Sequence, residues 1–490
     1  MRDIAGRDIQ ARIMRDNPWW NVAHFSGIPE GDYPRRVYFG PFKTLALNFK
    51  VRRAAILLGP RRVGKTVMIK QVILDAIKEG VPPGNVLYAS IDTPLYSGMA
   101  LTEFLEFVPA AALGERCVVV FDEIQYLKDW ETHLKDLVDS YPNVKFVASG
   151  SAAAALRLKS RESGAGRFSD FMLPPLTFYE FLEFTNQGAL ISEIEERKYQ
   201  AVDIEKLNLA FIDYLNFGGY PEAALNEEIR NDPDRFIRSD IIEKVLLKDL
   251  PSLYGIQDIQ GLNKLFMYLA YNTGAEATLD KISQSSGMAK PTIKKYIEYL
   301  ESAFLIIKVS TVDDTCRSLQ RERHFKIYLN NPSIRAALFS PVRPEDTVLI
   351  GHLAESAVFS QWQHSASFDH LRYARWKNEG EVDVVYLDHG RQKPSWIGEV
   401  KWSDRVAKNV DRETRHMKHL IGRHEIHSAF FTTRTEAFSA EIAGVLVDFR
   451  PTALYCYMVG RNITRNLDLR YLDAMMDDES EIVAESRSED

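Results

Sequence analysis

The sequence predicts an α/β protein with several domains, beginning with a parallel sheet and ending with a second α/β unit. Three observations support this prediction. Short apolar segments alternate with amphipathic ones between residues 54 and 150, as strands and helices do in a parallel sheet. Helical patterns dominate from about residue 178 to 250, and strand patterns return near residue 325. At 490 residues the chain is too long for one core and suggests roughly three domains.

We divide the chain into six segments. They are an N-terminal helical extension (1–40), the parallel-sheet core (41–177), a helical lid (178–255), a helix-turn-helix with a following strand (256–312), the second α/β unit (325–470) and an acidic tail (471–490). In the fourth segment Ser286-Gly287 ends one helix and Pro291 suits the first turn of the next, which predicts a winged helix-turn-helix. The final stretch of the tail, MMDDESEIVAESRSED, is acidic and lacks aromatic residues, so we expect the tail to be loosely ordered.

Composition and charge bound the class of protein. The chain is 45% hydrophobic and 26% charged, as in globular proteins, and its net charge of −7 gives no global sign of nucleic-acid binding. Cys117, Cys316 and Cys456 stand far apart, which argues against a disulfide framework and fits a reducing compartment. The sequence opens without a signal-peptide pattern, and its apolar runs are too short to span a bilayer. We therefore expect a cytoplasmic location and no membrane partner.

A phosphate-binding loop is predicted by the pattern GxxxxGK[ST], which lies between an apolar strand and a helix. Its residues are Gly59, Pro60, Arg61, Arg62, Val63, Gly64, Lys65 and Thr66. Lys65 would reach the β- and γ-phosphates, and the Thr66 hydroxyl would ligate Mg²⁺. A buried strand farther along ends in two acids, of which Asp122 would hold Mg²⁺ indirectly and Glu123 would polarise the attacking water. ATP, or GTP, and Mg²⁺ are the expected ligands.

Two further groups are candidates for contacts with the transferred phosphate. Ser149 or Ser151, at the end of the strand after the acidic one, would sense the γ-phosphate or else cap the next helix. Arg167 is the candidate arginine that stabilises developing charge, and Arg157 and Arg161 are alternatives. Otherwise Arg167 would only form a salt bridge on the surface. An arginine acting in trans would require an oligomer, and the sequence does not reveal one.

Several motifs resemble those of a family of predicted prokaryotic AAA-type ATPases: GPRRVGKT, FDEIQYL followed by Trp130, SGSAAAAL, GRFSDFMLPPLTFYEFL, GGYPEAAL and the C-terminal EVDVV…EVK. The resemblance covers about residues 40–435. It implies a P-loop ATPase domain, a winged helix and a C-terminal α/β domain of restriction-endonuclease-like fold, similar to PD-(D/E)XK nucleases. The family's biological role is poorly defined, so the resemblance implies mechanism more than purpose.

The segments EVDVV and EVK predict two neighbouring strands that carry acids. Residues two apart face the same side of a strand, so Glu399 and Lys401 project together, and a hairpin brings Asp383 near Glu399. Glu355 lies on an upstream helix, and Glu381 is an alternative acid on the face of Asp383. Grouped carboxylates suit Mg²⁺ or Mn²⁺, and a metal between Asp383 and Glu399 would activate water. Lys401 would position that water or neutralise the developing charge. These positions resemble the archaeal Holliday-junction resolvase branch of the nuclease superfamily; a related fold that only binds is the alternative.

Two groups of residues, nearly all of them cationic, are candidate DNA contacts, and DNA is the expected partner. The first group lies on the expected recognition helix of the winged helix and comprises Lys290, Thr292, Lys294 and Lys295. The second recurs at helical spacing after the Glu-x-Lys strand and comprises Arg405, Lys408, Arg412 and Arg415. For both groups the alternative is a solvated helix face or a protein contact.

Four histidines lie close together near the end of the chain: His416, His419, His424 and His427. They lack cysteine partners and HExxH spacing, so we expect an exposed helix and loop there in preference to a zinc site.

The sequence thus predicts an ATPase whose nucleotide state controls a DNA-binding, DNA-cutting C-terminal domain. Two alternatives remain open. One is an ATP-dependent switch with a non-cleaving, nuclease-derived binding domain, and the other is an oligomeric AAA-type protein remodeller.

Overall fold

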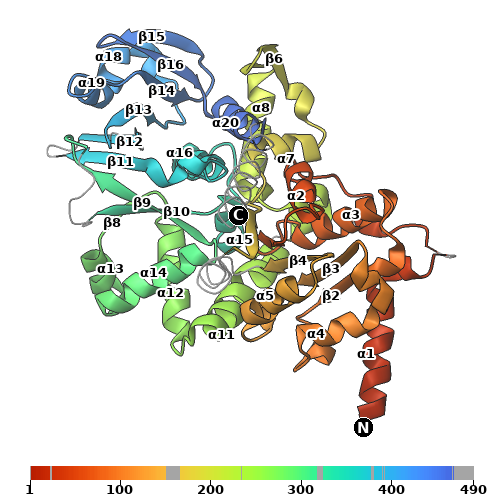
Figure 1. Ribbon diagram of the computed structural model, residues 1–490. Helices are drawn as coiled ribbons and strands as arrows, with labels where there is room; N and C mark the ends of the chain where they lie inside the picture. The colour runs from red at the N-terminus through yellow and green to blue at the C-terminus, as the bar shows by residue number, and fades with distance from the viewer. Residues whose placement is uncertain are drawn as a thin grey trace, which may run out of the picture. The chain divides into compact units, whose positions relative to one another are not determined.

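The computed structural model (Figure 1) describes residues 2–22, 25–150, 166–232, 234–316, 324–376, 380–388, 390, 392–465 and 467. The chain divides into two compact units. Unit 1 holds Met1–Pro174 and the last residues from Thr464 onward, and unit 2 holds Pro175–Ile463. No helix among the described residues is both long enough and apolar enough to cross a membrane.

Unit 1 contains a parallel five-stranded sheet in the order β2-β3-β4-β1-β5. The strands are β1 (Ala54–Leu58), β2 (Val86–Ser90), β3 (Cys117–Asp122), β4 (Val144–Gly150) and β5 (Phe168–Met172). Every residue of β1, β3 and β4 is buried, which their nearly continuous apolar sequences make favourable. The predicted parallel sheet is confirmed.

The helices of unit 1 are α1 (Arg2–Asp16), α2 (Phe39–Ala46), α3 (Lys65–Lys78), α4 (Leu101–Phe104) and α5 (Trp130–Ser140). Seven short 3-10 turns join them to the strands: Pro18–Trp20, Pro29–Gly31, Pro83–Asn85, Pro94–Tyr96, Leu105–Phe107, Ala110–Gly114 and Ile124–Tyr126. The chain after α1 is fastened to edge strand β2, because the Trp19 and Trp20 indoles both donate to the Val86 carbonyl, at 3.0 and 2.8 Å. This contact covers a sheet edge that would otherwise be open to pairing.

The first part of unit 2 is largely helical. It comprises α7 (Phe178–Phe184), α8 (Ile204–Phe217), α9 (Pro221–Leu225), α10 (Glu227–Asn231), the helical segments Asp234–Glu243 and Val245–Asp249, and α11 (Leu250–Tyr254), with a 3-10 turn at Gly188–Leu190. The continuous helical pattern that we predicted is wrong at one point, where β6 (Ile191–Glu195) and β7 (Lys198–Ala201) form an antiparallel hairpin. Most of the hairpin's side chains are exposed, so its sequence lacks the apolar alternation that marks a half-buried strand.

The rest of unit 2 is organised by a nine-stranded sheet in the order β15-β16-β14-β13-β12-β11-β9-β10-β8. Its strands are β8 (Glu276–Ala277), β9 (Ile306–Val312), β10 (Phe325–Leu329), β11 (Leu371–Trp376), β12 (Gly380–Leu387), β13 (Pro394–Glu399), β14 (Ser428–Thr433), β15 (Phe438–Ile442) and β16 (Val445–Pro451). The helices are α12 (Ile259–Tyr271), α13 (Leu279–Ser286), α14 (Lys290–Ser302), α15 (Ser333–Leu338), α16 (Thr347–Trp362), α17 (Arg405–Lys408), α18 (Val410–Glu413), α19 (Arg415–Ile421) and α20 (Thr452–Arg465), with a 3-10 turn at Ala366–His370.

The segments that we separated at residues 312 and 325 share this sheet. Strand β10 pairs antiparallel with both β9 and β8, and β9 pairs parallel with β11, where Thr311 faces Tyr373 and Val312 faces Ala374. Our division therefore falls between two hydrogen-bonded strands. Pairing between strands so far apart in the chain leaves no local pattern from which it could be predicted.

Strands β11, β12 and β13 run antiparallel, and β13 pairs parallel with β14. The connection from β13 to β14 passes through α17, α18 and α19. Helix α19 closes this side of the core with Met417, Leu420 and Ile421, which pack in the cluster that includes Val385 and Ile397 of the sheet. The antiparallel pairing of β12 and β13 therefore brings the start of β12 close to the end of β13.

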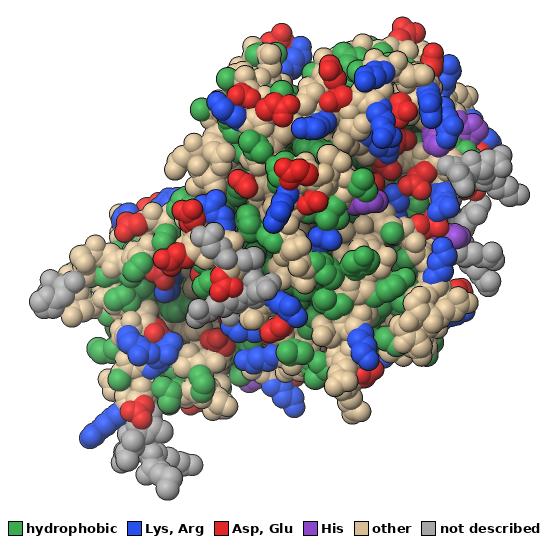
Figure 2. All heavy atoms as spheres, turned by 180° about the vertical axis from the view of Figure 1, so that it is seen from behind, with side chains coloured by type: hydrophobic (Ala, Val, Ile, Leu, Met, Phe, Trp, Pro, Cys, Tyr) green, Lys and Arg blue, Asp and Glu red, His purple; other side chains and the backbone are tan. Residues whose placement is uncertain are grey.

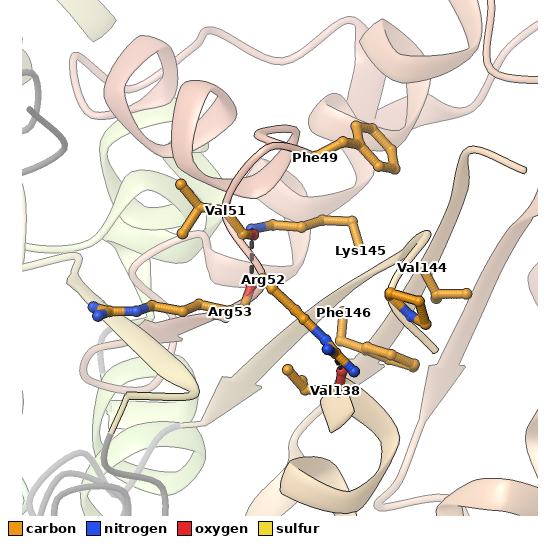
Figure 3. Close-up of a pocket in the computed structure, with 9 residues that line it drawn as sticks. Phe49, Val51, Arg52, Arg53, Val138, Val144, Lys145 and Phe146 are labelled. Atoms are coloured by element: carbon orange, nitrogen blue, oxygen red, sulfur yellow. Dashed lines mark hydrogen bonds between the residues drawn. The ribbon is translucent and has the colours of Figure 1, made fainter. Parts of the chain in front are cut away.

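A buried lysine fastens the chain before β1 to strand β4 (Figure 3). Lys145 is only 3% exposed, and its ammonium donates to the carbonyls of Arg53 at 2.8 Å and Val51 at 3.4 Å. Burial, reinforced by the charge of Arg53, lowers the pKa of Lys145 to about 8. Arg52 caps the end of α5 by donating to the Val138 carbonyl at 3.0 Å.

This burial predicts a pH-dependent contribution to stability. Between pH 8 and the unfolded lysine pKa of about 10.4, the unfolded chain binds more protons than the folded one, so the free energy of unfolding rises with pH. We expect wild type to gain up to roughly 3 kcal/mol relative to Lys145→Met from pH 7 to pH 10.5, measured by urea unfolding. Lys135→Met, which removes an exposed lysine from α5, should show no such gain. Parallel pH profiles for wild type and Lys145→Met would contradict the prediction.

Candidate functional site

The phosphate-binding loop lies between β1 and α3, and two of its positions require glycine. A Cβ on Gly59 would lie 2.2 Å from the carbonyl oxygen of Leu173. Gly64, which precedes the first residue of α3, has a φ of +95°, a conformation that side chains other than glycine rarely adopt. The loop therefore leads directly into the N-terminus of α3, where backbone N–H groups favour binding of an anion.

Two buried cations hold the loop. Lys65 is 5% exposed, and its ammonium donates to the carbonyls of Gly59 at 3.0 Å and Pro60 at 2.7 Å. Arg36 is 6% exposed and donates to the carbonyls of Val63 at 2.9 Å and Pro174 at 3.0 Å. Sequence analysis did not identify Arg36, because it stands alone in a Gly/Pro-rich stretch without a local motif.

Asp122, at the end of β3, is the point at which the predicted nucleotide-site residues meet. Its Oδ2 accepts hydrogen bonds from the Thr66 hydroxyl and the Tyr88 hydroxyl, each at 2.8 Å, and its Oδ1 accepts one from the Ser149 hydroxyl. Burial and the charge of Asp122 raise the pKa of Tyr88 far above its usual value, so Tyr88 acts as a donor. Tyr88 was not predicted. The Thr66 hydroxyl and the Asp122 carboxylate are oxygen ligands that fit Mg²⁺.

Glu123 follows Asp122 in a left-handed backbone conformation, with φ of +54°. Such a conformation is uncommon for residues other than glycine and costs free energy, so its presence beside the loop marks a constrained position. The backbone N–H of Glu123 donates to Ser149 Oγ at 3.1 Å, and Gln125 donates to the carboxylate. Burial raises the pKa of Glu123, although Lys65 opposes the shift. A buried carboxylate with a raised pKa suits a general base.

Arg167 lies elsewhere in unit 1. It donates to Asp139 of α5 and precedes Phe168, which pairs with Ala54 at the start of β1. The phosphate-binding loop follows the other end of β1, so the structure does not bring Arg167 to the loop of its own chain. Ser151, Arg157 and Arg161 lie outside the described residues. The roles of these four side chains stay predictions.

Unit 2 gathers four carboxylates and two lysines, which we call the acid–lysine cluster. Its members are Glu355 of α16, Glu381 and Asp383 of β12, Glu399 of β13, Lys326 of β10, and Lys401, which lies two residues after the end of β13. Lys401 Nζ lies 2.6 Å from Asp383 Oδ2 and 2.9 Å from Glu399 Oε2. The structure therefore brings together all four residues predicted from the Glu-x-Lys pattern, along with the alternative acid Glu381.

Lys326 is the member that sequence analysis missed. Its ammonium lies 2.7 Å from Glu381 Oε1, 3.2 Å from Glu355 Oε2 and 3.7 Å from Asp383 Oδ1. The Tyr328 hydroxyl also donates to Glu355 Oε2, at 3.0 Å. Lys326 stands in β10, whose five residues are all buried, and a lysine within a buried strand is itself a sign of a charged partner.

The environment separates the carboxylates by charge. Burial opposes ionisation of Asp383, but Lys401 and Lys326 outweigh it and lower the pKa of Asp383 below its usual range. Burial raises the pKa of Glu399 and of Glu355, because the lysines only partly offset it. Lys401 keeps its proton although burial works against it, since Asp383 and Glu399 raise its pKa. Of Asp383, Glu399 and Glu355, Asp383 is thus the one whose surroundings favour the ionised form.

Within the described parts of the chain, no group of three or more His, Cys, Asp or Glu side chains is arranged to hold a metal ion. Lys326 or Lys401 contacts each carboxylate of the acid–lysine cluster. Metal binding by Asp383 and Glu399 therefore stays a prediction.

The predicted DNA-contact residues lie on several elements. Lys294 and Lys295 are exposed on α14, whereas Lys290 pairs with Asp280. The helical ridge expected after Lys401 is wrong, because Arg405, Lys408, Arg412 and Arg415 are spread over α17, α18 and α19. Helices α17 and α18 are separate because Asn409 leaves the helical conformation, with φ of −155°, and caps α18 through the Arg412 N–H.

All four of these side chains are nevertheless exposed. On the face shown in Figure 2, Lys and Arg side chains are interspersed with Asp and Glu, in agreement with the modest net charge. Any DNA-binding surface must therefore be a local patch.

Replacing Lys326 tests the buried cluster. Lys326→Met leaves Glu355, Glu381 and the Oδ1 side of Asp383 without their ammonium, and the loss of one partner of a buried ion pair costs about 3–5 kcal/mol. We expect a large drop in the thermal stability of unit 2 at neutral pH, measured by calorimetry. Lys264→Met, on the exposed side of α12, should change stability by less than about 0.5 kcal/mol. Equal stability of the two variants would show that Lys326 does not neutralise the cluster.

Two family models match parts of the chain. Residues 51–182 match a family described as an AAA domain, and residues 208–345 match a domain of unknown function, DUF8612. An uncharacterized protein of Haemophilus influenzae is 26% identical over 266 residues, which cover 53% of this chain and 62% of that protein. An uncharacterized protein of Methanocaldococcus jannaschii is 26% identical over 321 residues, covering 62% and 66% of the two chains. The chain thus spans less than two thirds of the length of these two relatives.

Among solved structures, the Walker-type ATPase of Pyrococcus abyssi is 15% identical, with a TM-score of 0.38 over 63% of this chain and 99% of that one. DnaA of Aquifex aeolicus bound to AMPPCP is 16% identical, with a TM-score of 0.27 over 56% and 89%. TM-scores this low do not establish a common fold, so the family match and the geometry carry the conclusion. Residues 51–182 form an AAA-type P-loop ATPase domain.

Proposed function

We propose that this protein hydrolyses ATP and that its nucleotide state controls DNA binding by unit 2. The observation that carries the first part is the meeting of Thr66, Ser149 and Asp122 beside the loop that Lys65 holds. Thr66 and Asp122 would hold Mg²⁺, which when bound neutralises phosphate charge. Lys65 has its ammonium against the loop carbonyls, within the loop that would surround the phosphates.

Glu123 is the proposed general base. Its backbone N–H donates to Ser149 Oγ, and its pKa is raised toward neutral pH relative to that of an exposed glutamate. The Ser149 hydroxyl contacts both Asp122 and the Glu123 N–H. Hydrolysis of the γ-phosphate would therefore alter hydrogen bonds at the end of β4 through this one hydroxyl.

The DNA-binding part rests on the elements around α14. Helices α12, α13 and α14 with strands β8, β9 and β10 follow one another in the order of a winged helix-turn-helix. Lys294 and Lys295 are exposed on α14, the helix in the recognition position.

Hydrolysis is tested with two variants of the nucleotide site. Lys65→Ala should abolish ATP binding, whereas Glu123→Gln should keep binding and slow hydrolysis by roughly 10²–10⁴-fold, the range for loss of a general base. Phosphate release and binding of a fluorescent ATP analogue are measured side by side. Glu106→Gln removes an exposed acid of the same unit and should leave both unchanged. Full hydrolysis by Glu123→Gln would exclude Glu123 as the base.

The acid–lysine cluster favours a second function, metal-dependent DNA cleavage by unit 2. Asp383 stays ionised, Glu399 lies on the adjoining strand, and Lys401 contacts both. Asp383 and Glu399 offer the oxygen atoms that a hard cation prefers, and such an ion would supply activation of water. Lys401 would then stabilise negative charge at the scissile phosphate. The arrangement agrees with the nuclease-like domain that the sequence resemblance implies.

Cleavage is tested on linear, single-stranded and four-way-junction DNA with Mg²⁺ or Mn²⁺, with and without ATP. Lys401→Ala should lose cutting, and Lys393→Ala, an exposed lysine of the preceding hairpin, should keep it. If wild type hydrolyses ATP but cuts none of the three substrates, unit 2 is a binding domain and the protein an ATP-dependent switch. A ring that assembles with ATP and is stimulated by a polypeptide would instead identify a protein remodeller.

A further inference from the structure

A hollow of about 750 Å³ opens in unit 2 where β11 ends, β12 begins and α19 passes. Its walls are formed by Asp313, Asp314, Trp376, Gly380, Arg415, His416 and His419. This volume lies within the range of roughly 300–1,000 Å³ typical of small-molecule sites. The proposed ATPase and nuclease chemistries use none of these side chains except Arg415, a predicted DNA contact.

One wall of the hollow is made of flat rings. The indole of Trp376 stacks on the His419 imidazole, with centroids 4.9 Å apart and planes 23° apart, and meets His416 at 5.8 Å and 78°. A Cβ on Gly380 would lie 2.1 Å from the indole, so only glycine lets the ring pack against the backbone of β12. The rings are therefore held in place before any ligand arrives, which lowers the entropic cost of stacking.

The remaining walls carry charge of both signs. The Arg415 side chain is exposed, with its Nε 3.0 Å from His416 Nε2. Asp314 Oδ2 lies 2.6 Å from Arg423 and 3.4 Å from His419 Nε2, so its charge is largely neutralised. A planar wall, a guanidinium and carboxylate oxygens are the partners that the face of a base, the phosphate and the N–H groups of a base require.

The hollow also lies beside the acid–lysine cluster. Gly380 is followed by Glu381, whose Oε1 lies 2.7 Å from Lys326 Nζ, and the Glu381 N–H approaches His416 Nδ1 at 3.5 Å. A strand with one base in the hollow would thus place a neighbouring phosphate near Asp383 and Lys401.

We propose that this hollow binds one unpaired nucleotide of a DNA strand, with the base against Trp376, His416 and His419 and its phosphate at Arg415. The proposal rests on the proposed binding of DNA by unit 2 and specifies its substrate: a strand with an unpaired base. Among the four clustered histidines, His416 and His419 thereby acquire a role, whereas His427 is exposed and does not line the hollow.

The test is fluorescence anisotropy with a labelled thymidine strand of about 12 nucleotides, its abasic counterpart and a duplex of the same length. Wild type should bind the thymidine strand roughly 10-fold or more tightly than the abasic strand, as expected for stacking of a base on aromatic rings. Trp376→Ala should remove this preference, Trp376→Phe should retain most of it, and His419→Ala should weaken it. His427→Ala is the matched control and should behave as wild type.

The outcomes separate this inference from the proposed function. If wild type binds DNA but does not distinguish the thymidine strand from the abasic one, or if Trp376→Ala, folded by its circular dichroism, keeps the preference, the hollow does not take a base. If thymidine monophosphate competes as well as the strand, the hollow is a free-nucleotide site and the proposal is overturned. If wild type binds none of the three DNAs with or without ATP, the proposed DNA binding itself fails.

Discussion

Unit 2 depends on the neutralisation of four carboxylates that its fold draws into one place. Asp383 and Glu399 are only 3% and 5% exposed, and burying an ionised carboxylate without a counter-charge costs several kcal/mol. Two lysines offset this cost. Lys326 lies in β10, before the acids of β12 in the chain, and Lys401 lies just after β13. Strands β9 and β11 lie between β10 and β12 in the sheet, so the position of Lys326 beside the acids depends on the pairing of these four strands.

Unit 1 solves a related problem with hydroxyl groups. Asp122 is 1% exposed, and Thr66, Tyr88 and Ser149 donate to it. Neutral donors stabilise the carboxylate while leaving its negative charge available to a cation. In the acid–lysine cluster the ammonium groups cancel that charge. Asp122 therefore suits a cation that arrives with the nucleotide, whereas a metal ion at the acids of unit 2 would have to displace an ammonium group.

Sequence patterns predicted those parts of the structure whose geometry depends on residues close together in the chain. The loop from Gly59 to Thr66, the acidic end of β3 and the Glu-x-Lys pair could be read from spacing alone, because strand and loop geometry fix which side chains face together. Lys326, Arg36 and Trp376 escaped prediction, since each acts through contacts with residues far away in the chain. The β6–β7 hairpin escaped because its exposed strands bear no apolar period.

The pairing of β9 with β11 has a mechanical consequence. Thr311 and Val312 hydrogen-bond across to the strand that leads into the hollow and the acid–lysine cluster. The helix-turn-helix elements therefore cannot swing as a separate body without breaking a sheet ladder. The sheet therefore keeps α14 at a fixed distance from the acid–lysine cluster. If α14 contacts DNA as proposed, the cluster would meet the bound strand at a fixed distance from that contact.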